Sequence, residues 1–174
     1  HNQSRRQRQM CIRDSFQDIA KDYKVDDQFE NGRGTTLSDI LYRGRLDIIS
    51  SNWNGYHRAF VLEDNRFKDI ATPTYNIPTR IRTVISADFD NDGYDEIFMN
   101  NIGGPNKLFK IKENGFFEEI KIQNAYESNG LGTGAAVADI DEDGILELIV
   151  SHGESGMQPL TMYKADIKKD FNYI

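Results

Sequence analysis

The sequence has one cysteine among its 174 residues, and that residue, Cys11, lies close to the N-terminus. A disulfide framework and a cysteine nucleophile are therefore both excluded for the rest of the chain. No apolar run approaches the roughly 20 residues of a transmembrane helix, and no secretory signal peptide opens the chain. Convincing helical periodicity is absent as well. Since the formal net charge is −7, we expect no nucleic-acid partner and no membrane insertion.

The first fourteen residues differ in composition from the rest. Residues 1–14 contain four arginines and almost no apolar pattern. We interpret them as a non-native or disordered leader that takes no part in the fold. At the other end, the chain stops at Ile174 in a strand-like stretch without a terminal turn. We therefore expect residues 15–174 to be a fragment of a larger domain.

Ten of the 28 acidic residues are concentrated in two stretches with one pattern. In Asp88–Ile97 and Asp139–Leu148, carboxylates occupy positions 1, 3, 5 and 9, and glycine occupies position 6. Calcium takes six to eight oxygen ligands, backbone carbonyls included, and glycine permits the sharp turn that lets both halves of a loop face one ion. We predict two structural Ca²⁺ sites, with the backbone carbonyl of position 7 as a further ligand. The predicted ligands are Asp88, Asp90, Asp92, Tyr94, Glu96, Asp139, Asp141, Asp143, Ile145 and Glu147.

These stretches have two other possible interpretations, an EF-hand and solvated acidic turns. An EF-hand needs a bidentate glutamate at position 12 and flanking helices, but position 12 is Met99 in one copy and Val150 in the other, and the flanks are strand-like. The EF-hand is therefore excluded. Solvated acidic hairpin turns remain the alternative, although two copies in register favour calcium.

A third copy of the pattern is degenerate. The stretch Asp39–Asp47 keeps the carboxylates of positions 1 and 9 and the glycine of position 6, but positions 3 and 5 are Leu41 and Arg43. Neither residue can bind calcium. Our hypothesis is a metal-free loop in which Arg43 or Arg45 supplies the positive charge that the two aspartates need. A degenerate surface hairpin is the alternative.

Short motifs recur along the chain at a period near fifty residues. Phe16–Ala20 recurs as Phe67–Ala71 and as Phe117–Lys121, at offsets of 51 and 50 residues. We interpret these motifs as outer strands of successive structural repeats, with Phe16–Ala20 as the last strand of an incomplete first one. A period of this length is typical of β-propeller blades.

Each repeat predicts four short strands. Small residues in Thr83–Ala87 and Ala135–Ala138 suit crowded innermost strands, and short apolar second strands follow the acidic loops. Third strands carry an aromatic residue such as Phe109, and Asn114–Gly115 is a hairpin signal before the fourth strand. We predict an all-β fold, a partial β-propeller of about three four-stranded blades from a larger ring. The repeats are expected near residues 33–82, 83–133 and 134–174.

The doubled Asp-x-Asp-x-Asp-Gly-x-x-Glu loops resemble the FG-GAP/VCBS repeats of integrin α-subunit propellers. Through Ser51–His57, Ala87–Asp92 and Ser151–Ser155, the chain is more similar still to the cartilage acidic protein family. This resemblance implies a seven-bladed propeller, an extracellular location, calcium binding and a role in adhesion or matrix interaction. It also implies a downstream ASPIC/UnbV region and, in animal members, an EGF-like module, neither of which this stretch contains.

An enzyme needs a catalytic constellation, and the sequence offers none. Outside the leader the histidines are His57 and His152. The run His152–Gly156 superficially resembles a nucleophile elbow but lacks its Gly-x-Ser-x-Gly spacing and the following helix. We expect a non-enzymatic module. The alternative is a propeller domain of a secreted or periplasmic enzyme or glycan-binding protein whose active part lies outside this stretch.

Partner binding is expected at the connections between second and third strands. These connections carry Trp53, Tyr56 and Met157, and exposed aromatics among glycine and asparagine suit contact with a protein or glycan ligand. The alternative for Trp53 is packing between two blades.

Overall fold

The computed structural model describes residues 16–153 and 156–165. The predicted leader, residues 1–14, and the last part of the third repeat, residues 166–174, lie outside the described residues. The elements are α1 (Ala20–Tyr23), β1 (Gly32–Ser38), β2 (Asp47–Gly55), β3 (Arg58–Glu63), β4 (Arg66–Asp69), β5 (Thr79–Ala87), β6 (Glu96–Asn101), β7 (Lys107–Ile111), β8 (Phe117–Ile120), the 3₁₀ helix η1 (Asn124–Tyr126), β9 (Gly132–Ala138), β10 (Glu147–His152) and β11 (Thr161–Lys164). Within this part of the chain, no helix combines the length and the apolar character that crossing a membrane demands.

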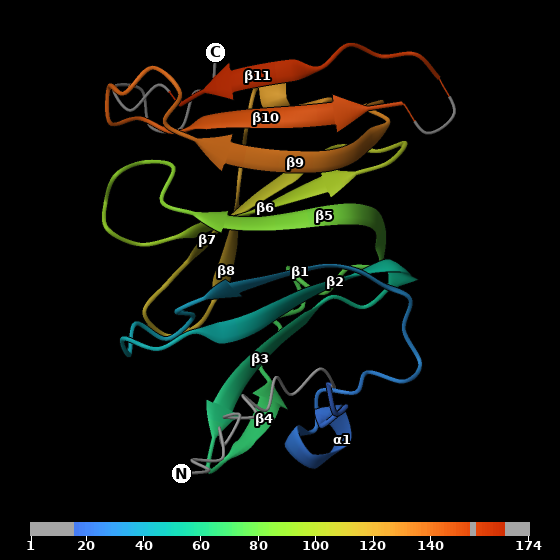
Figure 1. Ribbon diagram of the computed structural model, residues 1–174, viewed down its shortest axis with the longest axis vertical. Helices are drawn as coiled ribbons and strands as arrows, with labels where there is room; N and C mark the ends of the chain where they lie inside the picture. The colour runs from blue at the N-terminus through green and yellow to red at the C-terminus, as the bar shows by residue number, and fades with distance from the viewer. Residues whose placement is uncertain (1–15, 154–155, 166–174) are drawn as a thin grey trace, which may run out of the picture.

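The strands form three successive antiparallel blades. β1 to β4 pair in chain order, β5 to β8 repeat the arrangement, and β9 to β11 begin it a third time. The blades follow one another along the long axis of the molecule (Figure 1). β2 also pairs with β5, through Trp53 with Arg80 and Gly55 with Thr79, so the end of the second strand of the first blade is joined to the start of the innermost strand of the second blade. The predicted all-β partial propeller is confirmed.

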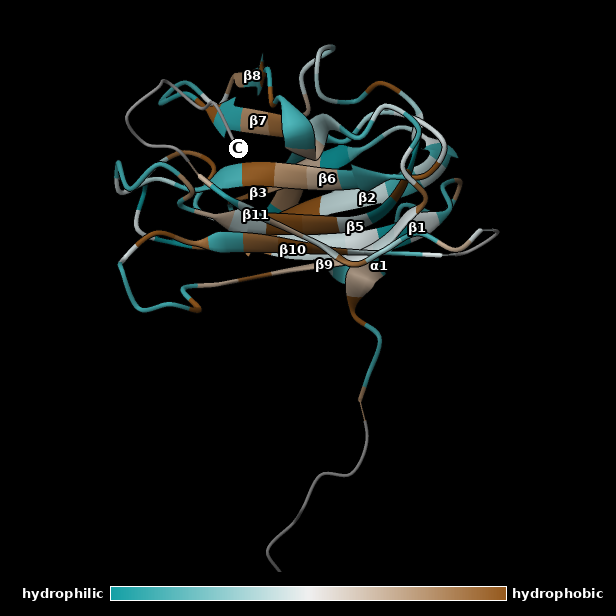
Figure 2. Cartoon of the chain, turned by 90° about the horizontal axis from the view of Figure 1, so that it is seen from above, coloured by the Kyte–Doolittle hydropathy of each residue, from teal (hydrophilic) through white to brown (hydrophobic). Residues whose placement is uncertain are grey.

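Two apolar cores lie between the blades, and the second blade supplies both. All six residues of β6 are buried, and Figure 2 shows the brown, hydrophobic middle of this strand between teal, hydrophilic ends. Ile97 and Met99 belong to the core shared with the first blade, whereas Phe98, between them, belongs to the core shared with the third. Since successive side chains of a strand point to opposite faces, β6 is buried on both sides.

The inner strands approach each other closely, as their small residues predict. A Cβ atom on Gly34 of β1 would lie 2.7 Å from the backbone nitrogen of Val84 in β5. At the next seam, a Cβ atom on Gly132 of β9 would lie 1.7 Å from the side chain of Asn100. A side chain in place of Gly34 would therefore collide with the backbone of the neighbouring blade, and one in place of Gly132 would displace Asn100.

One strand prediction was wrong. Phe16–Ala20 was expected to be an outer strand, but residues 16–19 have no regular secondary structure and Ala20 begins α1. Its two later copies behave differently, since Phe117 opens β8 fully buried, whereas Phe16 is fully exposed. A strand needs a neighbour for its backbone hydrogen bonds, and the described residues provide none for Phe16–Ala20. The prediction also missed the short helices α1 and η1.

Candidate metal centres

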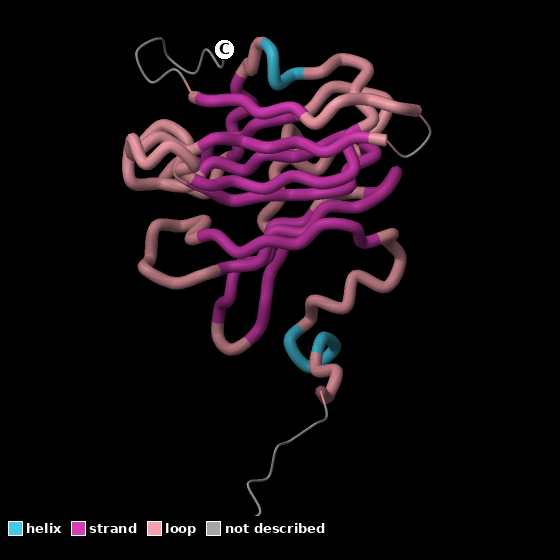
Figure 3. Tube along the Cα trace, turned by 45° about the horizontal axis from the view of Figure 1, so that its top comes forward, coloured by secondary structure: helices cyan, strands magenta, loops and turns pink. Residues whose placement is uncertain are grey.

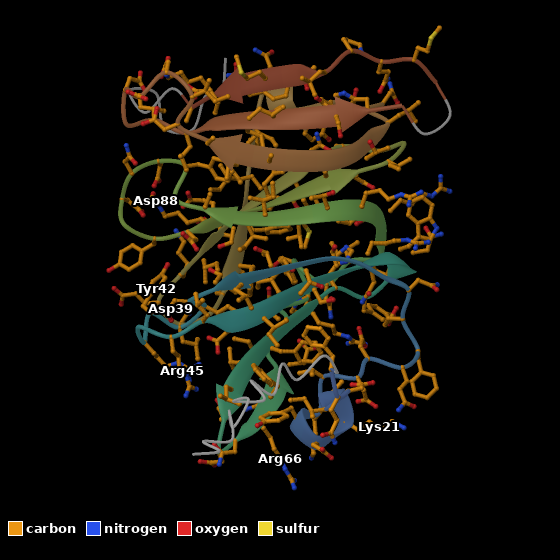
Figure 4. All side chains as sticks on the ribbon, in the orientation of Figure 1. Lys21, Asp39, Tyr42, Arg45, Arg66 and Asp88 are labelled. Carbon is orange, nitrogen blue, oxygen red and sulfur yellow. The ribbon has the colours of Figure 1, made fainter. Side chains whose placement is uncertain are left out.

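The acidic loops connect the first and second strands of each blade and lie at one rim. Figure 3 shows the loops gathered at the two ends of the strands. Asp39 and Asp88, from the first and second blades, lie on the same side of the molecule (Figure 4). The three loops share this rim because the strands before them, β1, β5 and β9, all run toward it. The strands after them, β2, β6 and β10, all run away from it.

The first carboxylate of each loop closes the turn. Between β5 and β6, Asp88 accepts hydrogen bonds from the N–H groups of Asp92 (3.1 Å) and Gly93 (2.9 Å). Between β9 and β10, Asp139 accepts the equivalent two bonds at 3.0 and 2.9 Å. The glycine at position 6 has a positive φ in both loops, 90° and 85°, which L side chains adopt at a cost. The predicted role of glycine in the turn is thus confirmed.

In each loop three carboxylates offer oxygen atoms within 4.8 Å of one another. The groups are Asp88, Asp90 and Glu96 in the second blade, and Asp139, Asp141 and Glu147 in the third. Six of the ten predicted ligands are therefore brought together. The other predicted carboxylates, Asp92 and Asp143, are not members of these groups; each accepts a hydrogen bond from the N–H of position 7, at 3.0 Å. Coordination by the carbonyls of Tyr94 and Ile145 stays a prediction.

The glutamate at position 9 is the most deeply buried of the predicted carboxylate ligands. Glu96 is fully buried, and its Oε2 accepts a hydrogen bond from the N–H of Phe89 at 3.0 Å. Its Oε1 is buried without a hydrogen bond. Burial, followed by the neighbouring Asp90, raises the pKa of Glu96 to about 8. The raised pKa means that a negative charge on Glu96 is unfavourable here, and a cation beside the carboxylate would offset that cost, so the residues fit calcium.

A lysine enters each predicted calcium loop, and the sequence prediction missed both. Lys110 Nζ lies 2.9 Å from Asp90 Oδ2 and also pairs with Asp92. Lys164 Nζ lies 2.7 Å from Asp141 Oδ2 and 2.8 Å from Glu147 Oε1. Each lysine directly follows the aromatic residue of the third strand, which is the signal that could have revealed them.

These ion pairs change the pKa values on both sides. Burial lowers the pKa of Lys110, but its bonds to Asp92 and Asp90 outweigh burial and leave it raised. Lys164 in turn lowers the pKa of Glu147 by hydrogen bonding. Glu96 differs because the Lys110 ammonium lies 3.8 Å from its Oε1. The two clusters are therefore alike in composition but unequal in how closely the lysine approaches the glutamate, 3.8 Å against 2.8 Å.

The degenerate loop contains an arginine where the other two contain carboxylate. Arg43 Nη2 lies 3.1 Å from Oδ2 and 3.2 Å from Oδ1 of Asp47, which is fully buried. Asp47 Oδ1 also accepts the N–H of Leu62 at 3.1 Å. Of the two arginines considered, Arg43 makes this contact, whereas Arg45 is exposed (Figure 4). The internal counter-charge is confirmed for Asp47 alone, since within the described residues the Asp39 carboxylate accepts only the backbone N–H groups of Arg43 and Gly44. That the loop binds no metal stays a prediction.

The residues expected to meet a partner lie at the opposite rim. Trp53 is half-buried and belongs to β2 rather than to the connection that follows it. The guanidinium carbons of Arg33, Arg80 and Arg82 lie 5.8, 6.0 and 4.8 Å from its ring centroid. Trp53 therefore takes part in the seam between the first two blades, because β1 and β5 supply those arginines. Tyr56 and Met157, by contrast, are exposed, at 52% and 103%.

Both histidines of the described chain serve structural contacts. His57 is buried, and its Nδ1 accepts the N–H of Asn52 at 3.0 Å while Nε2 lies 2.8 Å from Thr79 Oγ1. His152 lies 2.8 Å from Glu127 through Nε2 and 2.7 Å from the carbonyl of Pro159 through Nδ1. Because Nδ1 of His57 accepts a hydrogen bond, Nε2 of the neutral ring carries the proton and donates a hydrogen bond to Thr79, and Nε2 of His152 faces a carboxylate.

Comparison with known proteins gives a consistent result. The FG-GAP-like repeat matches residues 39–99 and, in a second copy, residues 88–150. The chain is 48% identical over 162 residues to Cartilage acidic protein 1 of Xenopus tropicalis, 44% identical over 164 residues to the human protein and 43% to the mouse protein. These alignments cover 86–87% of the chain but 25% of each relative. The chain thus spans about a quarter of the length of the curated relatives it matches, and the resemblance drawn from its loops is confirmed.

Proposed function

Since the chain belongs to the FG-GAP-like repeat family, we propose that it is part of an extracellular calcium-binding β-propeller that serves adhesion or matrix and protein interaction. Calcium is structural in this proposal: it holds the hairpin between the first and second strands of a blade. The observation that carries the proposal is the buried, unbonded Oε1 of Glu96 beside two further carboxylates. Cartilage acidic protein relatives support the extracellular setting.

Calcium would be held by the same chemistry in both loops. The carboxylates of positions 1, 3 and 9 already lie together, while position 5 and the carbonyl of position 7 would complete the shell. Bound calcium offsets the mutual repulsion of these groups and ties the loop to the buried start of the second strand. Because calcium binds the folded protein, it stabilises it by about 2.7 kcal/mol at a hundredfold excess over its dissociation constant.

Calorimetric titration and melting curves test this proposal. We expect two ions to bind and EDTA to lower the melting temperature. Asp90→Asn combined with Asp141→Asn should abolish most of both effects. Glu142→Gln is the matched control, because Glu142 lies in the same loop, is exposed and is outside the carboxylate group. Absence of binding heat together with an unchanged melting curve in EDTA would refute the proposal.

For the opposite rim we propose contact with a protein or glycan partner that carries anionic groups. The supporting observation is the set of three guanidinium groups within 6.0 Å of the Trp53 ring, in a chain whose net charge is −7. Arginine recognises carboxylate and sulfate oxygens through paired N–H donors. The neighbouring Tyr56 adds an exposed aromatic surface.

Retention on a sulfated-glycan matrix and on an acidic-peptide matrix, measured against salt concentration, tests the rim. Arg33→Gln with Arg80→Gln should lower retention, whereas Arg45→Gln with Arg66→Gln, equal in charge but away from Trp53, should preserve it. An equal loss of retention in both double variants would mean that net charge alone controls retention, and would contradict the proposal. Trp53→Ala is informative only beside a melting curve, because loss of stability alone would assign Trp53 to blade packing.

A further inference from the structure

Each carboxylate cluster already contains a positive charge, the ammonium group of the third-strand lysine. We propose that Lys110 and Lys164 are built-in competitors of calcium: the ammonium occupies the cluster in the absence of the ion and has to leave it when the ion binds. Calcium affinity is then set by an exchange between two cations. This inference rests on the proposed calcium binding and states what tunes it.

The lysines engage the oxygens that the ion would need. Lys164 Nζ lies 2.8 Å from Asp141 Oδ1, 2.8 Å from Asp143 Oδ2 and 2.8 Å from Glu147 Oε1. Those residues hold positions 3, 5 and 9, and Lys110 pairs with the same three positions in the second blade. Position 1 is left to close the turn. An ammonium and a calcium ion within one such cluster repel each other strongly, so they exclude one another.

Strand register produces this arrangement in both blades. Glu96 is the cross-strand partner of Lys110, and Glu147 is the cross-strand partner of Lys164. Directly opposed side chains on one sheet face lie within contact distance. A lysine one residue after the aromatic of the third strand is therefore placed over the glutamate of position 9.

The first blade shows what happens without that lysine. Ile48 pairs with Phe60 as Ile97 pairs with Phe109, so the residue in the lysine position is Val61. There the cation comes from Arg43, inside the loop, and the carboxylates of positions 3 and 5 are missing. The lysine thus occurs in the two loops that keep the full carboxylate set.

A lysine is suited to leaving the cluster. Its side chain is a flexible four-carbon stem with a strongly hydrated charge, and the side chains of Lys110 and Lys164 are 22% and 32% exposed, so each reaches water. A site that is competent for only a tenth of the time binds its ligand about tenfold more weakly. The lysines therefore keep the loops ordered at low calcium and shift binding to higher calcium concentrations.

Lys110→Met and Lys164→Met, made singly and together, test the exchange by calorimetric calcium titration. Each should tighten binding at its own loop about tenfold, which corresponds to about 1.4 kcal/mol, and should lower the melting temperature in EDTA. Lys112→Met is the matched control: Lys112 directly follows β7 and pairs with Glu118 at 2.6 Å, away from the loop. Lys110→Gln and Lys164→Gln, titrated from a calcium-loaded start, serve where a methionine variant does not fold without the ion.

The outcomes separate this inference from the proposed function. Calcium binding by the unaltered protein with unchanged affinity in all lysine variants would overturn the exchange alone. Weaker binding in the variants would also overturn it, because the lysine would then assist the ion. Absence of calcium binding in every form would overturn the proposed function. Calcium binding only after the lysines are replaced would support the exchange, but would contradict calcium binding by the unaltered protein.

Discussion

The loop of the first blade and the loops of the second and third share one backbone but differ in the source of their positive charge. Position 4 has a positive φ in all three, at Tyr42 (53°), Asn91 (58°) and Glu142 (59°). Asp39 closes its turn as the other first-position aspartates do, accepting the N–H groups of Arg43 and Gly44 at 2.8 and 2.5 Å. The turn is therefore encoded by positions 1 and 6. The carboxylates of positions 3 and 5, which the predicted metal site needs, are replaced by Leu41 and Arg43 in the first blade while the turn remains.

Removing the internal cation of the first blade should have the largest effect. Arg43→Met leaves the fully buried carboxylate of Asp47 without its ion pair, and we expect a loss of about 3 kcal/mol in the free energy of unfolding. Chemical denaturation with and without calcium measures it. The loss should be the same in EDTA, unlike losses in the other two loops, and Arg45→Met should cost little. A loss of unfolding free energy that depends on calcium would contradict the distinction between the first loop and the other two.

At the opposite rim, the first and second blades have different side chains in one equivalent position, His57 and Asn106. His57 accepts the N–H of Asn52 in the first blade as Asn106 accepts that of Asn101, at 2.9 Å, in the second. Burial, aided by Lys107, lowers the pKa of His57 to about 4. Because the unfolded chain then binds the proton more readily, stability is full above about pH 6.5 and falls as the pH approaches 4.

His57→Asn tests this pair. The variant copies the second blade and removes the titrating ring, so the difference in unfolding free energy between pH 7 and pH 5 should shrink by about 2 kcal/mol. Denaturation series at the two pH values measure it, with His152→Asn as the control for a ring that is hydrogen-bonded elsewhere. An equal pH dependence in the His57 variant would contradict the assignment.

The smallest effect is expected from replacing the glycine at position 6, which tests whether the three loops share one turn. Gly44, Gly93 and Gly144 have φ values of 72°, 90° and 85°, and a Cβ atom at each would meet nothing within 4 Å. Replacement by alanine therefore costs backbone strain alone, about 1 kcal/mol in each loop. Thermal melts in EDTA should show three equal losses. A much smaller loss at Gly44 would mean that the degenerate loop has its own turn.

The acidic loops could be predicted from the sequence because the pattern that defines each of them is local. The carboxylate spacing and the glycine lie within ten residues, so the turns could be predicted, and the recurrence of such short motifs about every fifty residues predicted the blades. Lys110 is 14 residues beyond Glu96 in the sequence, and only strand register brings them together. Trp53 was misplaced for a related reason: β2 extends to Gly55 because it pairs with β5, a contact between blades. Phe16–Ala20 has a strand motif, but residues 16–153 and 156–165 supply no partner strand for it.

Because β6 is buried on both faces, adjacent residues of this strand are expected to couple energetically with different blades. Phe98 and Met99 are adjacent in sequence, yet they pack in separate cores with residues of opposite blades. In a double-mutant cycle they should couple weakly with each other. Phe98 should couple instead with Leu148, 50 positions away, and Met99 with Ile49, also 50 positions away. The propeller's period is thus also the range over which energetic coupling extends along the chain.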